Sequence, residues 1–289
     1  MRKTVSRLVL AGAVAGALGL IAAAPSLAAT TEVVTPADVN TGGDWYTADT
    51  RPPGTGTFEA GPGTPPLGAA SFELRTPTPT SKVQLLTDEY DGVALADLTT
   101  LEYSTYRDPG STGFVAGVAA LNLRVDINND GNPDSYFVYE PYQSEGNDAV
   151  QTGVWQEWDA IDGGAAKWWV DNGGPTTCGQ SNPCTWTQLL ATYPGATIQE
   201  GTNFPGSLGF NQGSGNTGFV SNVDALVVGV DGNDTTYDFE LIRDLDGDGT
   251  ADTPPPTDKD QCKNGGYATF NNPSFRNQGQ CVSYVNGRR

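Results

Sequence analysis

The strongest constraint on the fold is an alternation of apolar and polar residues over short stretches. Every second residue is apolar in 121–127, and residues 235–241 repeat the pattern. Successive side chains of a strand point to opposite faces, so this period of two predicts half-buried β-strands. Glycine and proline interrupt the chain at short intervals, as in proteins built from many short strands. Further strands are expected at 70–75, 82–87, 101–107, 135–140, 153–158, 166–170, 206–211 and 223–230.

Together these strands predict an all-β fold, an antiparallel sandwich of the jelly-roll type. One short helix is expected at about 186–192. Thr185 and Gln188 precede its apolar residues with the spacing of a capping box, which marks a helix start. The segment 47–68 is rich in Gly, Pro and Thr and is predicted to form a long loop.

The first 29 residues have the features of a secretory signal peptide. Arg2, Lys3 and Arg7 give a positive start, an apolar run follows, and small residues at 25–29 offer a cleavage site. The run is short for a membrane anchor. We therefore expect a secreted, extracellular protein with no membrane span. Its parts are the signal peptide 1–29, a β-sandwich domain 30–250, a Pro-rich acidic linker 251–261 and a small cysteine-bounded C-terminal module 262–289.

The charge balance restricts the partners, and the absence of histidine restricts the chemistry. The chain has 34 acidic and 15 basic residues and no histidine. Without the three basic residues of the signal peptide, 12 basic residues face 34 acidic ones, a net charge of −22. Such a surface repels nucleic acid and anionic membranes. A Ser-His-Asp or Cys-His enzyme and an ordinary catalytic zinc site cannot be built without histidine.

Four cysteines form two local pairs, Cys178 with Cys184 and Cys262 with Cys281. An even number of cysteines in an exported chain predicts disulfides, although the sequence alone allows three connectivities. We expect local pairing, because each pair lies in its own segment. Redox catalysis is disfavoured because the chain contains no C-x-x-C motif.

Two acidic loops predict structural calcium sites. The first resembles the first half of an EF-hand loop, with Gly131 at the sixth position, although Phe137 replaces the usual twelfth-position Glu. The second resembles the calcium loops of dockerins and thrombospondin type 3 repeats. A hairpin turn and a solvated acidic linker are the alternatives for the two loops. The candidate ligands for Ca²⁺ are Asp126, Asn128, Asp130 and Asp134 in the first loop, and Asp244, Asp246, Asp248 and Asp252 in the second.

Aromatic residues gather in and near residues 155–169. Trp168 and Trp169 are adjacent, so a strand would turn one of them to the core and the other to the surface. Exposed aromatic rings beside acids are typical of sandwich proteins that bind sugars, whereas a core or capping role is the alternative. The predicted glycan-binding residues are Trp155, Trp168, Trp169 and Tyr139.

One acidic run raises the alternative of an enzyme. Residues 157–162 resemble the E-x-D-x-x-E strand motif of laminarinase-type jelly-roll glycosidases. The resemblance implies that Glu157 is the nucleophile, Asp159 the assistant and Asp162 the acid/base. The last position departs from the motif, because Asp is shorter than Glu.

The chain as a whole resembles exported bacterial β-sandwich proteins of the jelly-roll or LamG-like type, with a short two-cysteine C-terminal module. The resemblance lies in 45–47, 92–106 and 208–215 and in the tail 258–285. We expect a monomeric, non-catalytic protein that binds extracellular polysaccharide or cell-wall material. A carboxylate-based glycoside hydrolase or lyase and a structural envelope or matrix protein are the alternatives.

Overall fold

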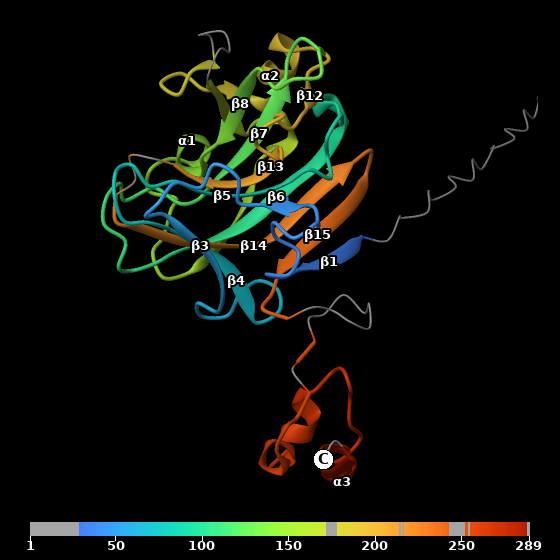
Figure 1. Cartoon of the computed structure of the whole chain (residues 1–289). Coiled ribbons are helices and arrows are strands. Elements are labelled where there is room, and N and C mark those ends of the chain that lie inside the picture. Colours follow the sequence, from blue (N-terminus) through green and yellow to red (C-terminus); the bar gives the residue numbers. More distant parts are fainter. Residues whose placement is uncertain are drawn as a thin grey trace, which may run out of the picture.

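The structure, a computed structural model, describes residues 29–171, 178–213, 215, 217–242, 252–253 and 255–287. Residues 1–28 of the predicted signal peptide lie outside this part of the chain, as do Asp244, Asp246 and Asp248 of the second acidic loop. The described part is mainly β, with two sheets and three short helices (Figure 1). This confirms the all-β expectation at the level of fold class.

The first sheet has seven strands and is mixed. Its order is β1-β15-β14-β4-β3, and β6 pairs with β14 and carries β9 at its far side. An antiparallel sheet was expected, but strand β1 runs parallel to β15, so this sheet is mixed. The sheet curls into a half-barrel. Its strands are β1 (Thr30–Val34), β3 (Thr55–Ala60), β4 (Ala70–Thr76), β6 (Leu98–Arg107), β9 (Trp155–Asp159), β14 (Phe219–Val230) and β15 (Asn233–Phe239).

The second sheet has eight strands and is antiparallel. Its order is β11-β10-β8-β7-β13-β5-β2, and β12 pairs with β7. Its strands are β2 (Trp45–Tyr46), β5 (Val83–Thr87), β7 (Ala120–Asp126), β8 (Ser135–Tyr139), β10 (Lys167–Asp171), β11 (Cys184–Thr185), β12 (Thr197–Ile198) and β13 (Leu208–Gln212).

The two sheets share one apolar core, to which the alternating positions contribute. Aromatic rings meet across it. The ring of Tyr103 on the mixed sheet lies 6.2 Å from that of Tyr139 and 5.7 Å from that of Phe210, both on the antiparallel sheet. Phe210 in turn meets Phe239 edge-on at 5.6 Å. Burying each such ring contributes roughly 2–3 kcal/mol, so the facing sheets stabilise one another.

The predicted helix is present as α2 (Trp186–Thr192), and its capping box is complete. The backbone N–H of Gln188 donates to Thr185 Oγ1, and the N–H of Thr185 donates to Gln188 Oε1. Two further helices were not expected, α1 (Pro141–Glu145) and α3 (Gln278–Gly287). The first is a single turn, too short to give a periodic pattern.

Three expectations about strands need correction. The predicted loop 47–68 contains β3, which pairs with β4 along its whole length. Leu241 was placed on the apolar face of 235–241, but it lies beyond the end of β15 and is 45% exposed. The residues of β7 are buried on both faces rather than one, and on its polar side Arg124 donates to the carbonyl of Phe204 while Asn122 lies at the bottom of a cleft. That polar side becomes important for the site described below.

Both disulfides have the expected local pairing, Cys178 with Cys184 and Cys262 with Cys281. The second closes the C-terminal segment, where Phe275 and Val285 pack on the two cysteines as a small apolar cluster of their own. Paired cysteines of this kind indicate an oxidising compartment. No helix in the described ranges is long and apolar enough to cross a membrane.

Candidate functional site

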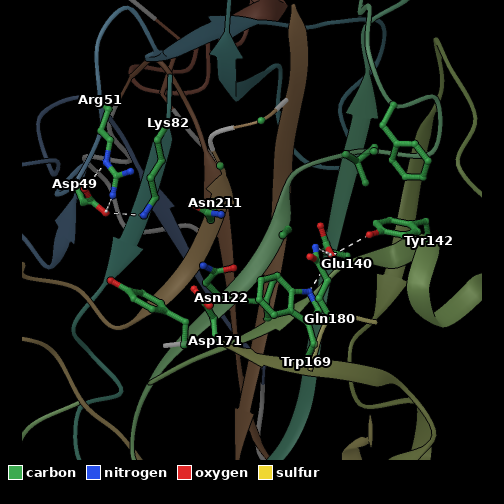
Figure 2. Close-up of a pocket in the computed structure, with 18 residues that line it drawn as sticks. Asp49, Arg51, Lys82, Asn122, Glu140, Tyr142, Trp169, Asp171, Gln180 and Asn211 are labelled. Atoms are coloured by element: carbon green, nitrogen blue, oxygen red, sulfur yellow. Dashed lines mark hydrogen bonds and ion pairs between the residues drawn. The ribbon is translucent and has the colours of Figure 1, made fainter. Parts of the chain in front are cut away.

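A cleft of about 740 Å³ opens on the outer face of the antiparallel sheet (Figure 2). The residues on its floor alternate with core residues. Asn122 lies between two core leucines, and Trp169 lies between Trp168 and Val170. Strand pairing places Trp169 opposite Val138 and Val138 opposite Asn122, so these three side chains form one row across the sheet. The same alternation that fills the core therefore also lines the cleft.

One end of the cleft is aromatic, and its geometry is fixed by a carboxylate. The indole N–H of Trp169 donates to Glu140 Oε2 at 2.8 Å, and the hydroxyl of Tyr142 donates to the same oxygen at 3.2 Å. Phe114, which is 45% exposed, meets the Tyr142 ring edge-on at 4.9 Å. Because Glu140 fixes the polar edge of Trp169, the ring keeps one orientation at the cleft wall.

The opposite end is charged. The carboxylate of Asp49 forms ion pairs with Arg51, at 3.0 Å, and with Lys82, at 2.6 Å. Burial raises the pKa of Asp49, but the hydrogen bonds from Lys82 and Arg51 outweigh it, so that pKa ends below its ordinary value. Burial lowers the pKa of Lys82, and the bond to Asp49 offsets only part of this effect. In Figure 2 this group and the Glu140–Trp169 group lie on either side of Asn122 and Asn211.

The floor between the two ends carries buried amides with unused hydrogen-bonding capacity. Within the described part of the chain, the side-chain oxygens of Asn122 and Asn211 have no hydrogen-bond partner. Gln84, which pairs with Asn211 in the sheet, has no partner for either atom of its amide. Each buried polar atom left unpaired costs about 1–3 kcal/mol. Unpaired polar groups beside a cleft are therefore candidates for ligand contacts.

The four predicted glycan-binding residues do not form one surface. Trp168 and Tyr139 face one another across paired strands and are both fully buried in the core. Trp155 lies on β9 of the other sheet, where its indole N–H donates to the carbonyl of Pro62 at 2.8 Å. Trp169 is the member of the set that lines the cleft. The expectation that adjacent Trp168 and Trp169 would face opposite ways is thus confirmed.

Several cleft residues were missed by the sequence reasoning. Asp49 and Lys82 come from segments 33 residues apart, and nothing in their local pattern indicates that they meet. Asn122 had a usable signal, because it is a polar position in the strongest strand pattern of the chain. The pattern does not say whether such a position faces bulk water or a cleft.

The predicted catalytic carboxylates lie elsewhere, on the outer side of β9. Glu157 and Asp159 are both exposed and point to the same face, and with Asp162 they border a shallow cleft of about 410 Å³. Asp159 Oδ1 accepts the backbone N–H groups of Ile161 and Asp162 at 2.8 and 2.7 Å, so this carboxylate shapes the turn after β9. A catalytic role for the three residues stays a prediction.

The first acidic loop holds its shape through its own backbone. Both carboxylate oxygens of Asp126 accept backbone N–H groups, including those of Asn129 at 2.6 Å and Gly131 at 2.7 Å. Asp134 accepts the N–H of Ile127 at 2.8 Å and the side-chain amide of Asn128 at 3.1 Å. These bonds form a tight turn, the alternative that the sequence left open.

Within the described ranges, no group of three or more Asp, Glu, His or Cys side chains is arranged to hold a metal ion. Of the second loop, Asp252 belongs to the described residues, and its carboxylate accepts the side-chain amide of Asn272 at 3.0 Å. Calcium at either loop stays a prediction.

The fold and the cleft define a mainly β, disulfide-bonded, two-sheet protein with a polar and aromatic cleft on one sheet. No protein-family model, no curated protein and no solved structure matches the chain. Its function is therefore argued from the cleft itself.

Proposed function

We propose that this is a secreted, non-catalytic protein that binds an extracellular glycan or cell-wall polysaccharide in the cleft of the antiparallel sheet. The observation that carries the proposal is the combination of an oriented Trp169 ring with the unpaired floor amides of Asn122 and Asn211. A sugar ring needs both kinds of contact, because it has an apolar face bordered by hydroxyl groups.

Each half of the cleft suits one part of a sugar. The apolar face of a pyranose stacks on an aromatic ring, and Trp169, Tyr142 and Phe114 provide an aromatic wall for it. Sugar hydroxyls both donate and accept hydrogen bonds, so they can satisfy the amide oxygens of the floor. The elongated arrangement from the aromatic to the charged end suits a chain of sugars rather than a compact small molecule.

The sandwich type, the calcium sites and the monomeric state are also part of what we propose. The two facing sheets are consistent with a jelly-roll sandwich of the LamG-like type, a shape that leaves one outer sheet face free for a ligand. Calcium is proposed as a structural ion at the acidic loops, where it would neutralise clustered carboxylates. We propose that the protein works as a monomer, because one chain supplies the whole cleft.

Retention on insoluble polysaccharides, followed by isothermal titration with soluble oligosaccharides of the retained polymer, tests the proposal. Trp169→Ala should weaken binding by about tenfold to a hundredfold, the usual loss when an aromatic anchor is removed. Trp155→Ala is the matched control, since Trp155 lies on the mixed sheet outside the cleft. The proposal fails if no polysaccharide is retained, or if both tryptophan variants bind like the parent protein.

A glycoside hydrolase or lyase is the second candidate, favoured by the shared exposed face of Glu157 and Asp159 on β9. Glu157→Gln should then abolish the release of reducing ends from the retained polysaccharide and leave binding at the cleft intact. Turnover that is unchanged in this variant would exclude a catalytic role for Glu157.

A further inference from the structure

The charged end of the cleft holds more positive than negative charge. Arg51, Lys82 and Arg124 lie around it, and within the described part of the chain Asp49 is the one carboxylate within ion-pair distance of any of them. The ring of Tyr136 connects two of these cations. Lys82 Nζ lies 5.7 Å from the centre of the ring, and the guanidinium carbon of Arg124 lies 5.5 Å from it.

Two of the three cations are nearly excluded from water. The Lys82 side chain is 12% exposed and Arg124 is 2% exposed. Arg124 donates to the Tyr136 hydroxyl at 3.1 Å and to the carbonyl of Phe204, but its Nη2 has no partner among the described residues. A buried cation without a counter-charge is costly. The lowered pKa of Lys82 has burial as its main cause, and repulsion from Arg51 and Arg124 contributes to it.

This concentration of positive charge is unusual for so acidic a chain. Of the seven basic residues between positions 30 and 250, Arg51 and Lys82 line this end of the cleft, and Arg124 lies beside it against the Tyr136 ring. Charges more than about 8 Å apart are largely screened at physiological ionic strength, so a bound group here experiences these cations more than the net charge. The seven basic residues are Arg51, Arg75, Lys82, Arg107, Arg124, Lys167 and Arg243.

The carboxylates of the cleft are balanced differently at its two ends. At the aromatic end, Glu140 orients Trp169. At the charged end, Asp49 is paired with two cations and Asp171 lies opposite Tyr136 in the sheet, so two carboxylates there face three cations. A ligand with one anionic group would therefore be repelled from the aromatic end and attracted to the end with Lys82. The two ends of the cleft therefore differ in charge, and this difference selects both the charge of the ligand and the direction in which it binds.

From this asymmetry, and resting on the glycan-binding function proposed above, we infer that the cleft recognises an acidic glycan. A sugar ring stacks on Trp169, the floor amides bind hydroxyl groups, and a carboxylate or sulfate group of the glycan lies against Lys82 and Arg51. Arg124 contributes its charge from behind Tyr136. A uronic-acid chain and a sulfated chain supply the same anionic chemistry, so the test must include both.

The experiment compares pairs of polymers that share a backbone and differ in whether they carry anionic groups. Titration calorimetry with polygalacturonate and its methyl ester forms one pair, and dextran sulfate with dextran forms the other. The parent protein should bind the acidic member of at least one pair about tenfold more tightly, the usual effect of one charge-assisted contact. This preference should shrink as the salt concentration rises.

Two variants locate the recognition. Lys82→Gln and Arg51→Gln should each reduce the preference for the acidic polymer and leave the affinity for its neutral partner unchanged. Arg51 is half exposed, so its replacement keeps the test valid if the buried Lys82 variant does not fold. The control is Arg75→Gln, because Arg75 is an equally exposed, ion-paired arginine on the mixed sheet. The control should keep the full preference.

The outcomes separate this inference from the function on which it rests. Equal binding of charged and neutral polymers, or equal weakening of both by the Lys82 and Arg51 variants, overturns acidic recognition but leaves glycan binding in place. Failure to bind any polymer overturns both. A preference that is lost in the two cleft variants, kept in the Arg75 variant and reduced by salt establishes the inference.

Discussion

The outer faces of the two sheets differ in whether their buried polar side chains have hydrogen-bond partners. On the mixed sheet, Asp224 and Glu240, which directly follows β15, are buried, and backbone donors of the chain pair with their carboxylates. The N–H of Leu67 donates to Asp224, and the N–H of Ala70 donates to Glu240 at 2.8 Å. On the antiparallel sheet, comparable positions line an open cleft and keep unpaired amides.

The comparison shows that a polar strand face is not by itself a binding site. Where a loop supplies backbone donors, the polar face is part of the stability of the fold. Where no segment covers it, the hydrogen-bonding capacity is left for a ligand. Substitutions on the two faces should therefore affect different measurements, stability on the mixed sheet and binding on the antiparallel sheet.

The largest expected effect is a difference in stability between substitutions of two adjacent residues of β10, one in the core and one at the cleft. Trp168→Ala should lower the free energy of unfolding by about 3–5 kcal/mol, because it leaves a cavity in the core and removes the indole N–H bond to Ala160. Trp169→Ala should lower it by less than about 1 kcal/mol, because the ring lies at the cleft wall. Urea denaturation measures both values. Equal destabilisation would contradict the division of the two faces.

The next effect concerns the cover over the carboxylates of the mixed sheet. Gly68 has a φ of +48°, and a Cβ at this position would overlap Glu240 Oε1. Gly68→Ala should therefore destabilise the fold through strain and overlap together, by about 2–4 kcal/mol. Gly92→Ala is the matched control, because Gly92 also has a positive φ but no atom lies within 4 Å of its added Cβ.

Thermal unfolding of the two glycine variants measures the difference. The Gly92 variant should lose about 1 kcal/mol through backbone strain alone. If the two variants melt together, the covering loop is not packed against Glu240 as described.

Two buried carboxyl groups of the mixed sheet should make the stability of the protein depend on pH. Burial raises the pKa of Asp224 and of Asp238 to about 7, and repulsion among neighbouring carboxylates adds to the effect. Because the pKa values of these two carboxyl groups are higher in the folded protein, the folded protein binds protons more tightly than the unfolded chain. This contribution to stability is full below about pH 4 and is lost as the pH rises towards 7.

Asp238→Asn should flatten this pH dependence and raise the melting temperature at pH 8 by a few degrees. The substitution removes the charge of a buried carboxylate, and the Oδ1 atom of that carboxylate has no hydrogen-bond partner in the described residues. Asp97→Asn replaces an exposed acid and should leave the slope unchanged. Melting curves from pH 4 to pH 8 compare the three proteins. An unchanged slope in the Asp238 variant would refute the assignment.

The smallest expected effect comes from calcium, of which one ion would bind to each acidic loop. The first acidic loop follows β7 of the antiparallel sheet, and the second follows β15 of the mixed sheet. Millimolar calcium should raise stability over chelator by about 1 kcal/mol for each weak site. Asp130→Asn and Asp246→Asn should each remove part of the shift in melting temperature, whereas Asp148→Asn, at an exposed position outside the loops, should not. No shift in the parent protein would exclude both sites.

Much of the fold could be predicted because strand patterns are local. Each expected strand overlaps an observed one, and α2 begins at its capping box as Thr185 and Gln188 indicated. Short edge strands such as β1 and β3 were missed, because five or six residues without alternation carry no periodic signal. The parallel pairing of β1 with β15 joins the two ends of the sandwich sequence and has no local signature.

The candidate site was predicted less well, and for a related reason. Trp169 lines the cleft because adjacent tryptophans on a strand must face opposite ways, and its role as a ligand contact stays a prediction. Trp168 lies in the core instead of the cleft, and the sequence does not tell which of the two tryptophans faces the core. The charged end of the cleft depends on Asp49 meeting Lys82, which only the folded chain brings together.

The sequence by itself determined the β class, most strand positions and the absence of histidine chemistry, because each of these depends on near neighbours or on composition. The tertiary structure decided which polar strand face is covered and which is open, because that depends on where distant loops pack. The same alternating pattern therefore gave buried carboxylates on one sheet and an open cleft on the other.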